Sequence, residues 1–173
     1  MSLLAATAQR IGQVRGLDAA AEWAQSYAEV LTESPQLDAV LGGDWLGHPV
    51  HPVASQLPIG AWTMGTLLDV ADGERYAGAV DLLTLVGVVA ALPTVATGAH
   101  DWVSTTGPAR RVGLVHALTM DTTLALFVAA TVVRRRGDRV KGRKLALAGA
   151  ATAAAGGFLG GHLAFALGVG RRR

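Results

Sequence analysis

Five histidines are the residues of this chain best suited to bind a metal or a cofactor. They are His48, His51, His100, His116 and His162. The chain has no cysteine, which excludes thiolate catalysis and iron–sulfur ligation by its own residues. An imidazole can ligate a metal or transfer a proton near neutral pH. The histidines are therefore the first candidates for a functional site.

Four long apolar segments determine where these histidines lie. Each holds about 20 residues, enough to cross a hydrocarbon core of about 30 Å. The segments are 53–71, 76–98, 112–133 and 145–169. Only 16% of the residues are charged, whereas a soluble domain carries about 25%. We therefore expect an all-α fold in which residues 42–173 form a four-transmembrane-helix bundle.

Antiparallel threading of these segments brings all five histidines into the same half of the membrane. His51 precedes the first segment, and His100 follows the second. His116 lies about one turn inside the third segment, and His162 lies about two to three turns inside the fourth. The broad expectation is a metal site formed by His48, His51, His100, His116 and His162.

A narrower cofactor site is expected from His51, His116 and His162. His116 and His162 occupy different helices at comparable depth, and such a pair can hold a b-type haem axially. His51 is expected to cap the first segment, which leaves His48 in the preceding loop. Haem is the leading cofactor, another metal or a quinone is an alternative, and purely structural roles for the histidines remain a third interpretation.

Two carboxylates are expected to orient the ligating groups. Asp101 follows His100 and can hydrogen-bond a neighbouring imidazole, which would fix its tautomer. Asp121 lies about 140° around its helix from His116. It is therefore not expected to bind the metal itself; it would instead orient another group or face another helix.

Residues 1–41 are more polar and are expected to form an amphipathic helix at the membrane interface. Asp18 is the predicted helix cap, and Pro35 is the predicted helix end. Trp23 and Tyr27 share one face of this helix. The opposite face is acidic, which disfavours attraction to anionic lipid, so a partner protein is an equal alternative to the membrane surface.

Basic residues predict the orientation of the bundle. The segment 134–144 contains seven Lys and Arg residues and is therefore expected in the cytoplasm. Both termini and the histidines would then lie on the outer side of a bacterial cytoplasmic membrane. The basic residues at 110–111 and 171–173 argue for the opposite orientation. Because nearly half of the basic residues lie in one loop, no nucleic-acid partner is expected.

Several short motifs occur together along the chain. They are DWLGHPVHP at 44–52, LPIGAW at 57–62, TGAHDW at 97–102, TGP at 106–108, VGLVH at 112–116 and GGHL at 160–163. As a set they resemble the bacterial membrane family called domain of unknown function 2231, over roughly residues 42–170. The resemblance implies a four-pass membrane domain. Because relatives commonly hold another residue at position 100, it also implies that His51, His116 and His162 are the stronger ligands.

The resemblance also implies an electron-transfer context. Some relatives carry a Rieske-type iron–sulfur domain after the position of Gly170. This chain has three residues beyond that position and no cysteine. The expected redox partner is therefore a separate protein, such as a Rieske-type ferredoxin.

Two functions from different classes follow. The leading hypothesis is a membrane redox module that holds haem, a metal or a quinone between its helices. The alternative is a non-enzymatic membrane anchor or accessory subunit whose N-terminal helix docks a partner protein. Membrane lipid is an expected partner in both cases, and a homo-oligomer is a further candidate assembly.

Overall fold

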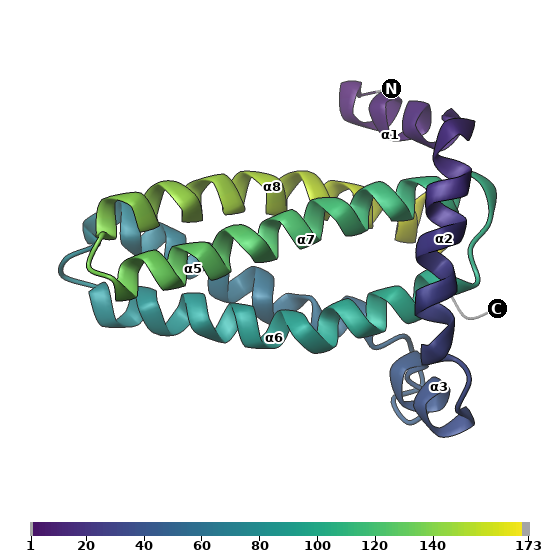
Figure 1. Cartoon of the computed structure of the whole chain (residues 1–173), viewed down its shortest axis with the longest axis horizontal. Coiled ribbons are helices and arrows are strands. Elements are labelled where there is room, and N and C mark those ends of the chain that lie inside the picture. Colours follow the sequence, from purple (N-terminus) through teal and green to yellow (C-terminus); the bar gives the residue numbers. More distant parts are fainter. Residues whose placement is uncertain (1, 171–173) are drawn as a thin grey trace. The chain divides into compact units, whose positions relative to one another are not determined.

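A computed structural model of the chain describes residues 2–170, and these residues form helices and connecting turns without any strand. Figure 1 shows the helices along the chain. The α-helices are α1 (Leu3–Gln13), α2 (Asp18–Ala28), α3 (Pro35–Gly42), α4 (His51–Ala54), α5 (Gln56–Asp72), α6 (Ala77–Val103), α7 (Gly107–Arg135) and α8 (Arg139–Phe165). Two single 3₁₀ turns, η1 (Arg15–Leu17) and η2 (Glu29–Leu31), flank α2. The predicted all-α fold is confirmed.

Two of the four predicted spans are long and apolar enough to cross a membrane. These are α6 and α7. Helix α5 has 17 residues, and its rise of about 26 Å falls short of a typical hydrocarbon core. Helix α8 is longer, but much of it is glycine and alanine, which are less apolar than leucine or valine. The four-span bundle therefore remains a prediction.

The N-terminal segment differs from the expected single helix. Asp18 was expected to cap the helix, but it is the first residue of α2, and Leu17 occupies the cap position without a side-chain hydrogen bond. Pro35 was expected to end this helix, and that expectation is wrong, because Pro35 begins α3. Proline suits the first turn of a helix, where its missing N–H would have no partner. Ser34 precedes it and caps α3 by accepting a hydrogen bond from the Leu37 backbone N–H.

The described chain divides into two compact units. The first comprises residues 2–53, 94–118 and 156–170, and the second comprises 54–93 and 119–155. Helices α6, α7 and α8 each contribute residues to both units. The predicted division of the sequence into segments 1–41 and 42–173 stays a prediction.

An aromatic pair forms the centre of the second unit. The rings of Trp62 and Phe127 stack with centroids 4.5 Å apart. Ala91, Ala130 and Ala146 are buried against them, so small side chains surround two large ones. The Trp62 indole N–H donates to the Thr84 carbonyl at 3.3 Å, which satisfies the only polar group of that ring.

A buried ion pair joins three helices of the second unit. Asp69 on α5 pairs with Arg134 on α7 and Arg143 on α8. The side chains of Asp69 and Arg134 are only 4% and 2% exposed. Arg134 also donates to the Thr84 hydroxyl at 3.1 Å. This pairing uses cations that the sequence placed in the loop 134–144, because α7 continues to Arg135 and α8 begins at Arg139.

Two apolar clusters hold the first unit together. One packs Ala8 of α1 against Val112, Leu159 and Leu163. The other packs Ala21 of α2 against Trp102 and Leu114. Figure 1 shows α2 lying across the end of α6 and the beginning of α7. The N-terminal helices are therefore packed on the ends of the long helices rather than separated from them.

Candidate functional site

Two of the predicted histidines lie next to each other in the first unit. His51 is the first residue of α4, and His116 lies on α7. Their ring centroids are 6.5 Å apart, and the ring planes are nearly perpendicular, at 88°. Both side chains are partly buried. The sequence predicted that both residues lie in the same half of the membrane, and the structure places their rings beside each other.

Each of these rings is held by a backbone carbonyl. The Nδ1 atom of His51 lies 3.0 Å from the Thr94 carbonyl oxygen. The Nδ1 atom of His116 lies 2.9 Å from the Gly156 carbonyl oxygen. A carbonyl only accepts hydrogen bonds, so each Nδ1 carries the proton. In the neutral imidazole, Nε2 then keeps its lone pair, which is the form that ligates a metal or accepts a proton.

Glycines on neighbouring helices make room for the two rings. A Cβ atom at Gly98 would lie 2.7 Å from Cε1 of His51, and one at Gly160 would lie 3.0 Å from Cε1 of His116. Both distances are shorter than ordinary carbon–carbon contacts of about 3.5 to 4.0 Å. Any larger residue at either position would displace the ring. Gly160 is one of the glycines of α8, and its lack of a side chain leaves room for the His116 ring.

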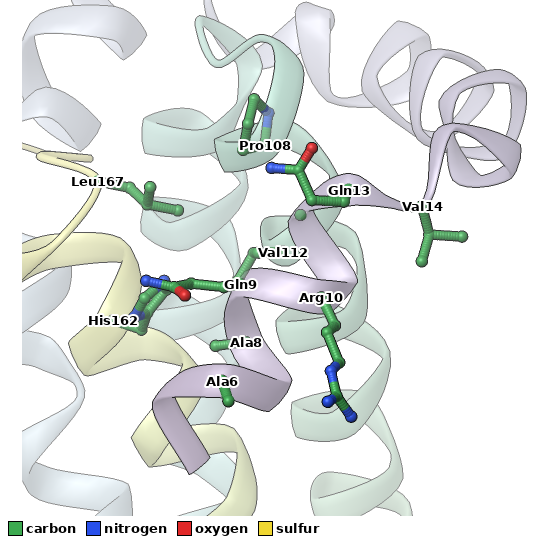
Figure 2. A pocket seen from close by; sticks show the side chains of 11 residues that line it. Ala6, Ala8, Gln9, Arg10, Gln13, Val14, Pro108, Val112, His162 and Leu167 are labelled. Atoms are coloured by element: carbon green, nitrogen blue, oxygen red, sulfur yellow. The ribbon is translucent and has the colours of Figure 1, made fainter. Parts of the chain in front are cut away.

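His162 lies in a different setting, in a hollow beside α1 (Figure 2). The hollow has a volume of about 670 Å³ and is lined by His162, by Gln9 and Gln13 of α1, and by the apolar residues Val112 and Leu167. Within residues 2–170 the His162 ring makes no hydrogen bond. The sequence did not predict α1, so it could not predict this environment of His162.

The other two histidines contact groups near the N-terminal helices. His48 is exposed, and its Nδ1 lies 3.1 Å from the Pro49 carbonyl oxygen in the same loop. His100 lies between two carboxylates: its Nε2 is 2.8 Å from Asp38, and its Nδ1 is 3.4 Å from Asp101. Asp101 therefore faces His100 rather than His51 or His116.

The five histidines do not form one cluster. Among residues 2–170, no three histidine, aspartate or glutamate side chains are grouped as the ligands of one metal ion. Asp121 is exposed on α7 and belongs to the second unit. The geometry that the structure supplies for ligation is thus the pair of His51 and His116.

Comparison with known proteins assigns the chain to a family. Residues 47–173 match a family described as predicted membrane protein, domain of unknown function 2231. The chain belongs to this family. The matched region includes His51, His116 and both glycines that seat their rings. No protein of curated function and no solved structure matches the chain.

The N-terminal segment lies outside the family match, yet it makes specific contacts with the family region. Arg111 donates two hydrogen bonds of 2.7 Å to the carboxylate of Asp18, and Arg110 lies 2.8 Å from Glu22. Arg111 holds the pKa of Asp18 below its ordinary value of 3.8. Sequence reasoning missed these pairs. The available signal was two adjacent arginines and two acidic residues spaced four apart, Asp18 and Glu22, which share one helix face.

Proposed function

We propose that this membrane protein is a redox module in which His51 and His116 ligate a metal centre. The observation that carries the proposal is the pair of rings whose Nδ1 atoms are both bound to backbone carbonyls. In that arrangement each neutral ring keeps the lone pair of its Nε2 atom, and the two ring centroids lie 6.5 Å apart. A redox metal held there would supply one-electron chemistry, and the protein would supply its ligands and its position.

The ring separation supports a shared metal. With metal–nitrogen bonds of about 2.0 to 2.1 Å, two imidazoles on one ion have ring centroids roughly 5 to 6.5 Å apart, depending on the angle at the metal. The observed distance of 6.5 Å lies at the upper end of this range. The distance is thus compatible with His51 and His116 holding either a bare metal ion or the iron of a haem, and the packing around the rings must decide between them.

The packing of the two rings favours a small group over a macrocycle. Both rings lie directly on glycines, and His51 and His116 do not line either of the two hollows described among residues 2–170. Haem would require these helices to separate, whereas a bare metal ion would not. His162, in its own hollow, is proposed as the contact of a second group such as a quinone head group.

The proposed topology has four spans, with 134–144 in the cytoplasm and both termini and the histidines on the outer side of a bacterial cytoplasmic membrane. Large apolar side chains exposed on all four long helices support it. Examples are Leu67 on α5, Val89 on α6, Leu118 on α7 and Leu147 on α8. Large apolar side chains exposed in this number on each helix are expected to be covered by lipid or protein. Electrons would pass to a separate partner, such as a Rieske-type ferredoxin.

The test is the visible spectrum and metal content of protein purified in mild detergent. A Soret band, or a stoichiometric metal, should be lost in both His51→Ala and His116→Ala. His48→Ala is the matched control, because this exposed histidine contacts only its own loop, and it should retain the cofactor. His162→Ala separates a third ligand from an independent site. A colourless, metal-free protein that retains its fold would contradict the redox proposal.

A second candidate function is a non-enzymatic anchor or accessory subunit. The observation that favours it is the N-terminal segment, which lies outside the family match and exposes Leu3, Leu4, Val40 and Trp45. Under this proposal α1 and α3 would present side chains to a partner protein. The metal-free outcome described above would favour it.

A further inference from the structure

Helix α2 exposes large apolar side chains, while two of its acidic side chains pair with arginines of α7. Trp23 and Tyr27 are each 66% exposed, and Val30 in the following turn is 55% exposed. The two aromatic rings form an edge-to-face pair with centroids 4.9 Å apart. The neighbouring exposed residues on this face, Ala19 and Ser26, are uncharged. A helix in water normally shows the opposite arrangement.

The inward face of α2 satisfies its polar groups within the protein. Asp18 and Glu22 pair with Arg111 and Arg110 at the beginning of α7. Ala21 is fully buried. Two of the acidic side chains of this segment, Asp18 and Glu22, are thus paired with arginines, which lowers the negative charge that would repel an anionic lipid surface. Glu29, next to Val30, remains exposed, so the proposed contact depends on the apolar side chains rather than on charge.

Helix α2 is fixed to the turn that joins the two best candidate spans. The side-chain amide of Gln25, only 7% exposed, donates to the carbonyl of Trp102 at 2.9 Å and to that of Thr105 at 3.1 Å. These carbonyls belong to the end of α6 and the turn before α7. A short turn between two spans lies at the membrane boundary. Helix α2 therefore lies at that boundary too.

We propose that the outward face of α2, formed by Trp23, Tyr27 and Val30, is embedded in the lipid head-group region of the membrane that α6 and α7 cross. Tryptophan and tyrosine are enriched at this depth because their rings are apolar with one polar group. An amphipathic helix there is held by burial of its apolar face. The proposal rests on α6 and α7 being spans, and it does not depend on any cofactor.

The absence of cysteine from the sequence makes site-directed spin labelling direct. A nitroxide at Ala19→Cys reports on the outward face while Trp23 and Tyr27 remain in place. Val89→Cys, 58% exposed within α6, is the control for the hydrocarbon core. Arg136→Cys, in the turn between α7 and α8, is the control for water. The proteins are reconstituted in phosphatidylcholine vesicles, and the accessibility of each label to oxygen and to a water-soluble nickel chelate is measured.

The expected result is a depth for the label at position 19 between those of the labels at 89 and 136. Adding Trp23→Ser should move the label at position 19 towards water. Nickel access at position 19 equal to that at 136 would overturn the proposal. Exclusion of both reagents, with dipolar broadening between labels, would overturn it in favour of a contact with a second copy. Water access at position 89 would instead remove the premise that α6 is a span, whatever the result of the cofactor test.

Discussion

At the scale of single residues, Asp69 is the buried carboxylate that pairs with two arginines. One buried carboxylate faces two guanidinium groups, Arg134 and Arg143, on different helices. Burying a charge is costly unless it is paired, and removing one partner leaves the other uncompensated. Asp69 is therefore the residue on which the packing of α5, α7 and α8 in the second unit depends most.

Replacing Asp69 with asparagine should destabilise the protein by about 3 to 5 kcal/mol, as for other broken buried pairs. The matched control is Asp81→Asn, because the pair of Asp81 and Arg139 is exposed by 46% and 33% and such pairs contribute about 0 to 1 kcal/mol. Unfolding in detergent by added denaturant measures both variants. Equal losses of stability in the two would contradict this ranking.

Two glycines of α8 should respond in opposite directions to the same substitution. Gly160→Ala places a methyl group 3.0 Å from the His116 ring, and overpacking of this kind costs about 1 to 3 kcal/mol. Gly157 has no atom within 4 Å of the added carbon. Gly157→Ala should therefore leave stability unchanged or raise it by up to about 1 kcal/mol, since alanine favours a helix. Thermal unfolding monitored by circular dichroism distinguishes the two.

At the scale of helices, the apolar runs predicted the long elements well, whereas the N-terminal helices depended on distant partners. The positions of α6 and α7 follow from local hydrophobicity, which can be read from a short stretch of the sequence. The orientation of α2 does not, because Asp18 is 93 residues from Arg111 in the sequence. A helix with one apolar and one acidic face gives no local sign of which face turns inward.

The same limit applies to the candidate site. Threading four segments places His51 and His116 in the same half of the membrane, but the pair that the sequence favoured was His116 with His162. The carbonyls that fix their tautomers are backbone atoms of Thr94 and Gly156, and backbone carbonyls leave no signature in a sequence. The inclusion of His162 in the same site could not be checked from the sequence, since its surroundings include the unpredicted α1.

The contact of α2 with α7 should weaken in acid. Because the folded pKa of Asp18 lies below its ordinary value of 3.8, the unfolded or detached state binds the proton more readily. The stabilisation is complete above pH 3.8 and is lost as the pH falls through the folded pKa. The protection of the α2 amides from hydrogen exchange, measured relative to the intrinsic exchange rate at each pH, should therefore fall below about pH 4.

Asp18→Asn serves as the control for this titration. It should show faster exchange in α2 already at neutral pH and a smaller change on acidification. If the pH dependence of hydrogen exchange in α2 were the same in this variant as in the wild type, a titrating group other than Asp18 would be responsible.

At the scale of the whole molecule, the question is how many helices cross the bilayer. The family is described as one of predicted membrane proteins, and two helices are long and apolar enough to cross a membrane. Helix α5 is short for a span, but the bilayer can thin locally around a short segment at modest cost. The exposed leucines of α5 and α8 would otherwise face water.

Cysteine scanning measures the topology in intact membranes. Leu67→Cys on α5 and Leu147→Cys on α8, which are 56% and 44% exposed, should resist a water-soluble maleimide if both helices are spans. Arg136→Cys should react only when the reagent reaches the cytoplasm. Rapid labelling at both 67 and 147 would leave two spans, rapid labelling at one of them would leave three, and labelling of 136 from outside would invert the orientation.

The hydrogen bonds of Gln25 also bear on how the protein is made. The amide that caps α6 is synthesised 77 residues before the Trp102 carbonyl that it meets, and chains emerge from the ribosome N-terminus first. The N-terminal helices are therefore synthesised before the residues with which they pair. A fragment that begins at the family boundary, residue 47, would leave the Trp102 and Thr105 carbonyls without the Gln25 amide, so we expect the end of α6 to be less stable in that fragment.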